Sequence, residues 1–343
     1  MGRNKVNKSL TQQVKETLDA KLAIGQSKFA AKIDGTYTQF IYSWETYRSY
    51  LKHACYFARW CKKQEVDPRL GHKPRTLDEC RIFAERWIQD SMDRSLSAHT
   101  IKLELSALAK LYGCKTQDFN IKTPPRQRKN IKRSRGNAAR DKNFSISNNK
   151  NLIVFCKCTG LRRAELSQIR GTDLIDSKGQ LWMNIHRATK GGRPRTSPVV
   201  GSPEELEIVR KLCADAREGK LFPHPNENAD IHSFRATYAN RVYELHKREL
   251  NEFRQERLIV YKNGIVDSYT AKNGRKEYGK FSHLYIDIEG KPKMKPGYRD
   301  ISSCFFCRGD LKGKVYDRRA LFEASRALGH NREDVVAEHY LYC

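Results

Sequence analysis

Several side chains in the second half of the chain are of types that carry out chemistry in proteins. In chain order they are Arg162, Glu165, Lys190, His232, Arg235, His330, Tyr340 and Tyr342. An arginine fork can bind two oxygens of an oxyanion, a histidine can move protons near neutral pH, and a phenol can attack as a nucleophile. Each residue alone also has a plainer explanation, because surface arginines, core histidines and lysines in turns are all common.

The elements around these residues can be predicted from local patterns. LIVFCKCTGLRRAELSQIR indicates two helices joined at Thr159-Gly160, and GQLWMNIHRATKGGRPRTSPVV indicates strands that turn at Lys190-Gly191-Gly192. IHSFRATYANRVYELHKREL and ALFEASRALGH indicate further helices. On the first of these, His232 and Arg235 are three residues apart and share one helix face.

The C-terminal stretch LGHNREDVVAEHYLYC holds two candidate tyrosines. Residues 332–342 are predicted as a helix with Asn331 as its N-cap. Two residues along a helix correspond to a rotation of about 200°, so Tyr340 and Tyr342 would face nearly opposite ways. Hydrophobic periodicity does not choose between them.

Taken together and in order, TGLRRAEL, the lysine turn, HSFR, LGH and the terminal tyrosine resemble the tyrosine recombinase (phage integrase) family, of the mobile-element integrase type. The resemblance covers residues from about 144 to 343. It implies a mainly α fold with a small antiparallel β-sheet. It also implies a two-domain, C-shaped DNA clamp, in which a helical core-binding domain precedes the catalytic domain.

The resemblance also implies roles for the charged residues. Arg162 and Arg235 would bind the non-bridging oxygens of a DNA phosphodiester, where negative charge develops in the transition state. His232 and His330 would supply further donors and assist proton movement. Glu165 would hold the Arg162 side chain and would not react.

The same resemblance separates the two tyrosines and gives Lys190 a role. Lys190 on its hairpin would protonate the leaving 5′ hydroxyl. The family's nucleophile follows the Gly-His histidine in a context like His-Tyr-Leu, which Tyr340 matches, ten residues after His330. Tyr340 would therefore form the 3′-phosphotyrosine ester, and Tyr342 would pack or meet a neighbour. The ester conserves the bond energy, so no cofactor and no metal is expected.

The composition agrees with a polyanionic partner. The chain has 343 residues, and 66 Lys+Arg against 39 Asp+Glu give a net charge of +27. Such a charge favours double-stranded DNA, with an anionic membrane surface as the alternative. No run of about 18 apolar residues predicts a spanning helix. The start of the chain does not resemble a signal peptide, so a cytoplasmic, bacterial, nucleoid-associated protein is expected.

The cysteines offer another interpretation, which the sequence does not favour. There are 10 of them, scattered along the chain, and they are expected to be reduced thiols. Cys304-Phe-Phe-Cys307 has the spacing of half a zinc site, but no second half lies nearby. Two thiols beside buried phenylalanines are the better interpretation.

Composition and spacing predict three segments. Residues 1–123 are predicted as the helical domain, with a capping box at Thr76 and Glu79 and a helix stop at Gly113. Residues 124–143 are predicted as a basic linker and 144–343 as the catalytic domain, with an inserted β-rich element at about 250–310. The linker either is a flexible tether or touches DNA phosphates, and the second is favoured. Its candidate contacts are Arg126, Arg128, Lys129, Lys132, Arg133 and Arg135.

These expectations together predict a site-specific DNA recombinase or integrase that acts through a Holliday junction and integrates and excises a mobile element. A homotetramer on DNA is expected, with an accessory DNA-bending or directionality protein as a candidate partner. One alternative is an enzyme like a type IB topoisomerase, which shares most of this residue set. The other is a non-catalytic DNA-binding regulator derived from a recombinase, which would have no use for Tyr340.

Overall fold

The computed structural model describes residues 8–127, 144–190, 192–261, 264–271, 283–308, 311–330 and 332–341. Its internal contacts divide the chain into two compact units, with residues 8–127 in the first and 144–341 in the second. Each unit is described by itself. Within the described residues, none of the helices has both the length and the hydropathy needed to cross a lipid bilayer.

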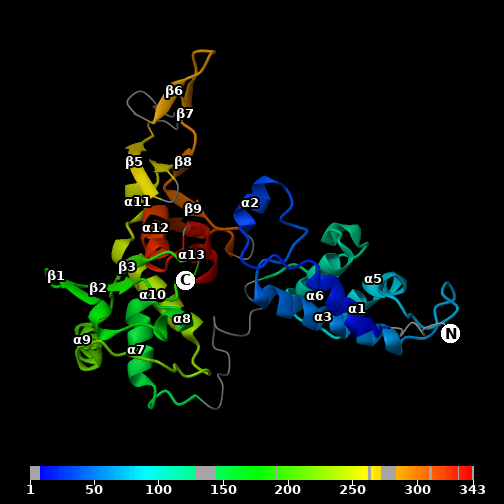
Figure 1. Cartoon of the computed structure of the whole chain (residues 1–343). Coiled ribbons are helices and arrows are strands. Elements are labelled where there is room, and N and C mark those ends of the chain that lie inside the picture. The colour runs from blue at the N-terminus through cyan, green and yellow to red at the C-terminus, as the bar shows by residue number, and fades with distance from the viewer. Residues whose placement is uncertain are drawn as a thin grey trace. The chain divides into compact units, whose positions relative to one another are not determined.

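The first unit is a bundle of helices (Figure 1). Its elements are α1 (Leu10–Asp19), α2 (Lys28–Ile33), α3 (Trp44–Lys63), α4 (Leu77–Cys80), η1 (Arg81–Phe83), α5 (Ala84–Asp93), α6 (Ala98–Tyr112) and η2 (Thr116–Asp118). The long helices α3 and α6 pack on each other and on α1. Fully buried side chains from them, such as Phe57 and Leu108, form one core.

Two local signals in this unit form as the sequence predicts. Thr76 accepts a hydrogen bond from the Glu79 amide, and the Glu79 carboxylate accepts one from the Thr76 amide, which completes a capping box. Gly113 follows α6 with a φ of 68°, the left-handed conformation that ends many helices. The start and the end of these helices are therefore encoded locally.

The second unit combines helices with four small antiparallel sheets among its described residues. Its helices are α7 (Lys150–Thr159), α8 (Arg163–Leu166), η4 (Gly171–Asp173), α9 (Pro203–Ala216), α10 (Ile231–His246), α11 (Leu250–Phe253), α12 (Arg318–Ala327) and α13 (Glu333–His339). Its strands are β1 (Leu174–Ser177), β2 (Gln180–Ile185), β3 (Arg195–Pro198), β4 (Glu256–Tyr261), β5 (Gly264–Thr270), β6 (Leu284–Ile286), β7 (Pro292–Met294), β8 (Tyr298–Ser302), β9 (Cys304–Phe306) and β10 (Val315–Asp317). The mainly helical character with small antiparallel sheets agrees with the expected fold class.

Helix α10 is central to this unit, because it packs against α7 and against α12. Helix α12 in turn packs on α13 and on β3. Two neighbouring cores result, one around α7, α9 and the β1–β2–β3 sheet, and one around α10, α12 and α13. Segments far apart in the sequence thus meet along α10.

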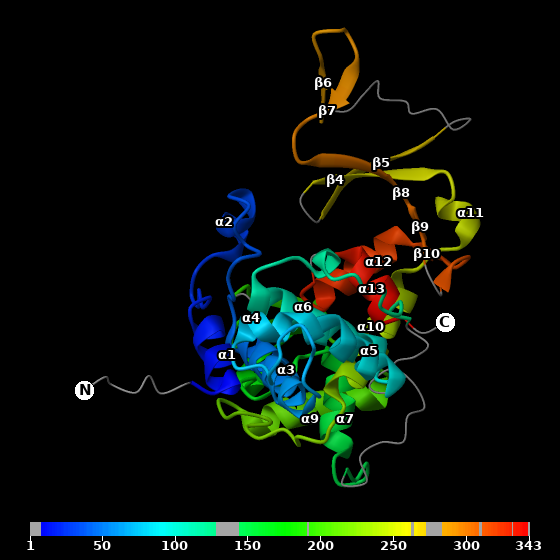
Figure 2. The same ribbon diagram turned by 90° about the vertical axis from the view of Figure 1, so that its right-hand side faces the viewer.

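Strands β4 to β10 lie between α10 and α12 in the sequence. Strands β4 to β9 fall in the stretch of about 250–310 for which a β-rich element is predicted, and β10 follows that stretch. The sheet β5–β4–β8 packs one face on α12, where Leu258 and Val260 contact Phe322. The hairpin of β6 and β7 extends away from α7 and α9, at the far end of this unit (Figure 2). The element therefore has a part integrated into the core and a part that projects.

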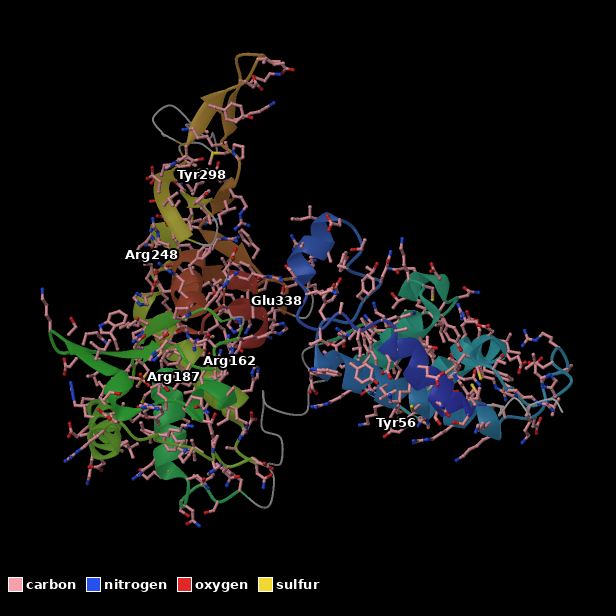
Figure 3. The ribbon with its side chains drawn as sticks, in the orientation of Figure 1. Tyr56, Arg162, Arg187, Arg248, Tyr298 and Glu338 are labelled. Atoms are coloured by element: carbon pink, nitrogen blue, oxygen red, sulfur yellow. The ribbon has the colours of Figure 1, made fainter. Side chains whose placement is uncertain are left out.

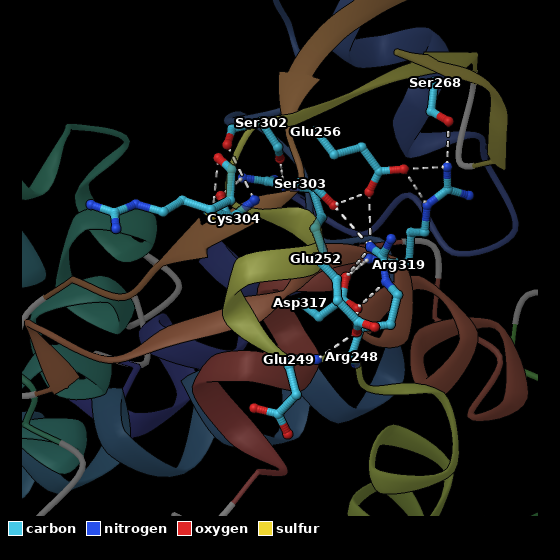
Figure 4. A network of polar contacts seen from close by, with 12 residues as sticks. Arg248, Glu249, Glu252, Glu256, Ser268, Ser302, Ser303, Cys304, Asp317 and Arg319 are labelled. Atoms are coloured by element: carbon cyan, nitrogen blue, oxygen red, sulfur yellow. Dashed lines mark hydrogen bonds and ion pairs between the residues drawn. The ribbon is translucent and has the colours of Figure 1, made fainter. Parts of the chain in front are cut away.

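A polar network joins the sheet to α12 (Figure 4). The Arg248 guanidinium donates to both carboxylate oxygens of Asp317, the N-cap residue of α12, at 2.8 and 2.9 Å. It also donates to Glu256 on β4 at 2.8 Å, and Arg319 pairs with the same Glu256 carboxylate. Hydrogen bonds and charge pairs therefore fix the start of α12 to the strand-rich element.

The end of the chain differs from the prediction of a helix over residues 332–342. Helix α13 ends at His339, and Tyr340 is its C-cap residue with φ −121° and ψ −35°. Its N-cap is Arg332, whereas Asn331 was expected in that role. Asn331 and Tyr342 lie outside the described residues. The rotation argument for the two tyrosines therefore does not apply, because Tyr340 has already left the helix.

Candidate active site

Arg162 lies at the N-cap of the short helix α8 (Figure 3), just after the left-handed Gly160 that ends α7. Its amide donates to Glu165 Oε2 at 2.8 Å and its Nη1 to Glu165 Oε1 at 2.8 Å. Glu165 is 1% exposed. A second arginine, Arg195 at the start of β3, donates Nη1 and Nη2 to the same two oxygens, each at 2.8 Å. One buried carboxylate therefore holds two guanidinium groups.

The ionisation of Glu165 follows from these contacts. Burial alone would raise its pKa, because a desolvated carboxylate prefers to be neutral. The hydrogen bonds and charge of Arg195, together with Arg162, outweigh burial and lower the pKa to about 2. Glu165 is therefore a carboxylate at neutral pH and cannot donate a proton. Glu165 contacts Arg162 directly, and its role of holding that side chain for catalysis stays a prediction.

Arg235 lies on α10 and is 3% exposed. Its guanidinium donates to the Gly160 carbonyl and, at 3.1 Å, to the Leu328 carbonyl. Burial lowers the pKa of Arg235 to about 10, which still leaves it charged at neutral pH. Gly160 packs directly on the Tyr238 ring, since a Cβ built there would lie 2.1 Å from the ring. The α7–α8 turn can approach α10 this closely because that position has no side chain.

Three consecutive carbonyls at the end of α12 each accept a hydrogen bond from a different arginine. Arg195 Nε donates to Ala327 (3.3 Å), Arg235 Nη2 to Leu328 (3.1 Å) and Arg162 Nη2 to Gly329 (3.2 Å). The carbonyls at a helix C-terminus lack partners within the helix and carry partial negative charge, so cations suit them. These bonds fix the backbone immediately before His330.

His330 and Tyr340 meet where α12 and α13 end. The distance between His330 Nε2 and the Tyr340 hydroxyl is 3.3 Å. The His232 ring from α10 contacts the Tyr340 ring with centroids 4.8 Å apart, and the Arg235 guanidinium lies 5.8 Å from the centroid of that ring. Tyr340 is 5% exposed. A phenol, two imidazoles and a buried arginine thus converge at one place.

His330 is neutral in this environment. Burial and the charges of Arg235, Arg162, Arg195 and Lys190 lower its pKa to about 3. A neutral imidazole has one ring nitrogen without a proton, which can accept one from a neighbouring hydroxyl. In this neutral state His330 can accept a hydrogen bond from the Tyr340 hydroxyl, while the surrounding arginines attract an anion.

Lys190 lies in the connection between β2 and β3 and is exposed. Strand β2 ends at Ile185 and β3 begins at Arg195, so the connection is longer than the glycine turn that was predicted. Arg187, near its start, donates to Asp173 at 2.7 and 2.9 Å (Figure 3). Lys190 is close enough for its charge to lower the pKa of His330.

The structure thus brings Arg162, Glu165, Arg235, His330 and Tyr340 together, with His232 against the Tyr340 ring. Of the predicted linker contacts only Arg126 is described, and the others lie outside the described residues. The sequence reasoning missed Arg195. Its position three residues after Gly192, at the start of a predicted strand, was the only signal available for it.

The comparisons with known proteins add the following. Neither the protein-family models nor the curated proteins give a match. Among solved structures, the XerH site-specific recombinase bound to its difH substrate is 13% identical, with a TM-score of 0.42, and the match covers 71% of this chain and 87% of that chain. The Tn1549 transposon integrase in complex with transposon right end DNA is 13% identical, with a TM-score of 0.34 and coverage of 70% and 88%. These identities and TM-scores are too low to assign a function to this chain.

Proposed function

We propose that this chain is a site-specific DNA recombinase or integrase that cuts and rejoins DNA strands through Tyr340. The observation that supports this proposal is the Tyr340 hydroxyl, 3.3 Å from a neutral His330 and beside the buried Arg235. A phenol next to a proton acceptor and cations suits attack on a phosphodiester. The net charge of +27 suits a DNA partner.

In the proposed reaction the Tyr340 oxygen attacks the scissile phosphorus and its proton passes to His330, because the negative charge of the bound phosphate offsets the arginine charges and raises the pKa of that imidazole. The bond from phosphorus to the 5′ oxygen breaks, and Lys190 protonates that oxygen as it leaves. Arg162 and Arg235 stabilise the charge on the non-bridging oxygens. The product is a 3′-phosphotyrosine ester, which a 5′ hydroxyl from another duplex can attack to reverse the same steps.

Exchange between two duplexes requires one active site for each strand that is cut. A homotetramer on DNA would provide four sites, and exchange of one strand pair before the other would pass through a Holliday junction. Integration and excision of a mobile element is the proposed biological role. In this scheme the basic linker, including Arg126, contacts the phosphate backbone.

The test uses a suicide substrate, a duplex nicked so that cleavage releases a short fragment and traps the covalent product. The wild-type protein should become attached at a 3′ phosphate, and Tyr340→Phe should bind DNA without attachment, because the ring lacks the oxygen. Tyr342→Phe is the matched control and should still attach. If Tyr342→Phe loses the adduct and Tyr340→Phe keeps it, the nucleophile is assigned to the wrong residue.

Two further measurements separate the proposal from its alternatives. A regulator without catalytic activity would bind DNA but give no adduct with the wild-type protein. An enzyme like a type IB topoisomerase would relax a supercoiled plasmid as a monomer and would not join two separate sites. Recombination between two sites carried on one plasmid would support the proposal directly.

A further inference from the structure

Arg195, the first residue of β3, contacts two separate parts of the candidate site. It donates to both oxygens of Glu165 at 2.8 Å and to the Ala327 carbonyl at 3.3 Å. Its side chain is 10% exposed. We infer that Arg195 is a positioning residue, which keeps Arg162 directed at the phosphate and His330 beside Tyr340. This inference rests on the proposed function and deepens it.

The first reason is how the Glu165 carboxylate is shared. Arg195 binds it with two parallel hydrogen bonds, whereas Arg162 uses only Nη1 of its guanidinium on the carboxylate and directs Nη2 to the Gly329 carbonyl. Bidentate pairing is the preferred geometry between arginine and a carboxylate. Without Arg195, Arg162 would be expected to turn its own fork onto Glu165, and fewer of its donors would point at a phosphate.

The second reason is the packing before His330. A Cβ at Gly329 would lie 2.9 Å from the Arg195 side chain, so the two are in close contact. Ser197, two residues further along β3, donates its hydroxyl to the Ala327 carbonyl at 2.7 Å. Strand β3 therefore holds the backbone that carries His330.

The third reason is the chain connection to Lys190. Arg195 is the first residue of β3 and closes the segment 186–194, in which Lys190 lies. The guanidinium at the end of that segment and the guanidinium of Arg162 are thus bound to the same Glu165 carboxylate. Arg195 does not touch the reacting atoms in this scheme, so it acts through Glu165, Arg162 and the α12 terminus.

The experiment compares two suicide substrates, one with an ordinary scissile phosphate and one with a methylphosphonate. The methyl group replaces a charged oxygen, so the transition state needs less help from cations. Arg195→Met should reduce the rate of adduct formation on the phosphate by on the order of 100-fold, because Arg162 would no longer be held in place as a donor to the transition state. On the methylphosphonate its deficit relative to wild type should shrink, as should that of Arg162→Ala. The deficit of Lys190→Ala relative to wild type should be the same on both substrates.

Arg163→Met is the matched control. Arg163 is a partly buried arginine next to Arg162, but among the described residues its guanidinium donates to backbone carbonyls of residues 225–229 and not to Glu165. Its loss should reduce stability and affect both substrates equally. If Arg195→Met does not fold, Arg195→Lys takes its place. It keeps the charge but not the fork, and its deficit should be smaller and should follow the same pattern.

An equal deficit of the Arg195 variant on both substrates would overturn the inference. If the wild-type protein itself gives no adduct, the proposed function is wrong, and the positioning role is then judged from a crystal structure of Arg195→Met. Movement of the Arg162 guanidinium from the Gly329 carbonyl onto both Glu165 oxygens would support the role. An unchanged Arg162 would exclude it.

Discussion

The Tyr340 hydroxyl lies 3.3 Å from His330 Nε2, and the two residues sit on either side of the short helix α13. His330 follows α12, whereas Tyr340 is the C-cap residue of α13. Asn240 on α10 donates to the Tyr340 carbonyl at 3.1 Å, so the cap is also attached to the centre of the unit. The candidate nucleophile is thus positioned by the ends of α12 and α13 and by one side chain of α10.

Glu165→Gln should destabilise the protein strongly. The neutral amide would leave Arg162 and Arg195 without their shared negative charge, and breaking a buried ion pair costs about 3 kcal/mol of unfolding free energy or more. Urea denaturation followed by circular dichroism would measure it. The control is Glu205→Gln, which removes a more exposed pair with Arg241 and should cost about 1 kcal/mol. Equal losses in the two variants would contradict the role of Glu165.

Gly160→Ala should also be destabilising. The new methyl group would lie 2.1 Å from the Tyr238 ring, in a backbone with φ +61°. Overpacking and the left-handed backbone together should cost more than about 2 kcal/mol of unfolding free energy. Gly179→Ala has a similar φ of +80° but nothing within 4 Å of the Cβ, so it should cost only about 1 kcal/mol. Thermal denaturation of the pair would separate packing from backbone strain.

Lys190→Ala should reduce cleavage strongly and leave DNA binding nearly normal, because the leaving oxygen carries charge only during the reaction. A substrate with sulfur at the 5′ bridging position has a leaving group that needs no proton. That substrate should restore cleavage to the variant, measured as the rate of adduct formation. Failure of the sulfur substrate to restore it would mean that Lys190 is not the general acid.

DNA binding should depend steeply on salt. If roughly eight phosphates are contacted per protomer, a plot of log K against log salt should have a slope of about −7. Replacing Lys129, Lys132, Arg133 and Arg135 with alanine should lower the magnitude of the slope by up to ~4. The affinity for all DNA sequences should fall alike. Fluorescence anisotropy over a salt series would measure this. An unchanged slope would show that the linker does not contact DNA.

The projecting β6–β7 hairpin should serve assembly or DNA contact and not the chemical step. The structure limits how this can be tested, because Leu258 and Val260 pack on Phe322 and a deletion of residues 257–300 would expose that core. Replacing residues 284–294 by a Gly-Ser turn avoids this, since the Lys295 amide already bonds to the His283 carbonyl. Cleavage of a nicked half-site should persist while pairing of two sites weakens. Full recombination by the variant would contradict the prediction.

Local features of the fold could be predicted from the sequence, because their signals lie within a few residues of each other. The capping box of Thr76 and Glu79 and the stop at Gly113 are examples. Features that depend on distant partners could not. Arg195 is recognised only through Glu165, 30 residues earlier, and the end of α13 is held by Asn240, 100 residues before Tyr340. Periodicity contains no information about such pairs.

The same limit applies to the role of each site residue. The order of the motifs indicated Arg162, Arg235, His330 and Tyr340, and the structure brings them together. The sequence did not indicate that the three arginines would bind consecutive carbonyls, because that depends on where α12 ends in space. Spacing along the chain identifies residue types, whereas tertiary packing decides which atoms they contact.

Helix α12 is held by polar contacts at both of its ends. One end is fixed by Asp317 to Arg248 and the strand-rich element, and the other end presents three carbonyls to three arginines. Its ten residues span about 15 Å. A shift of α12 along its axis would therefore displace all three arginine contacts and His330 at once. A substitution that weakens the contact between Asp317 and Arg248 is therefore expected to act on the candidate site through α12, with the arginines themselves unchanged.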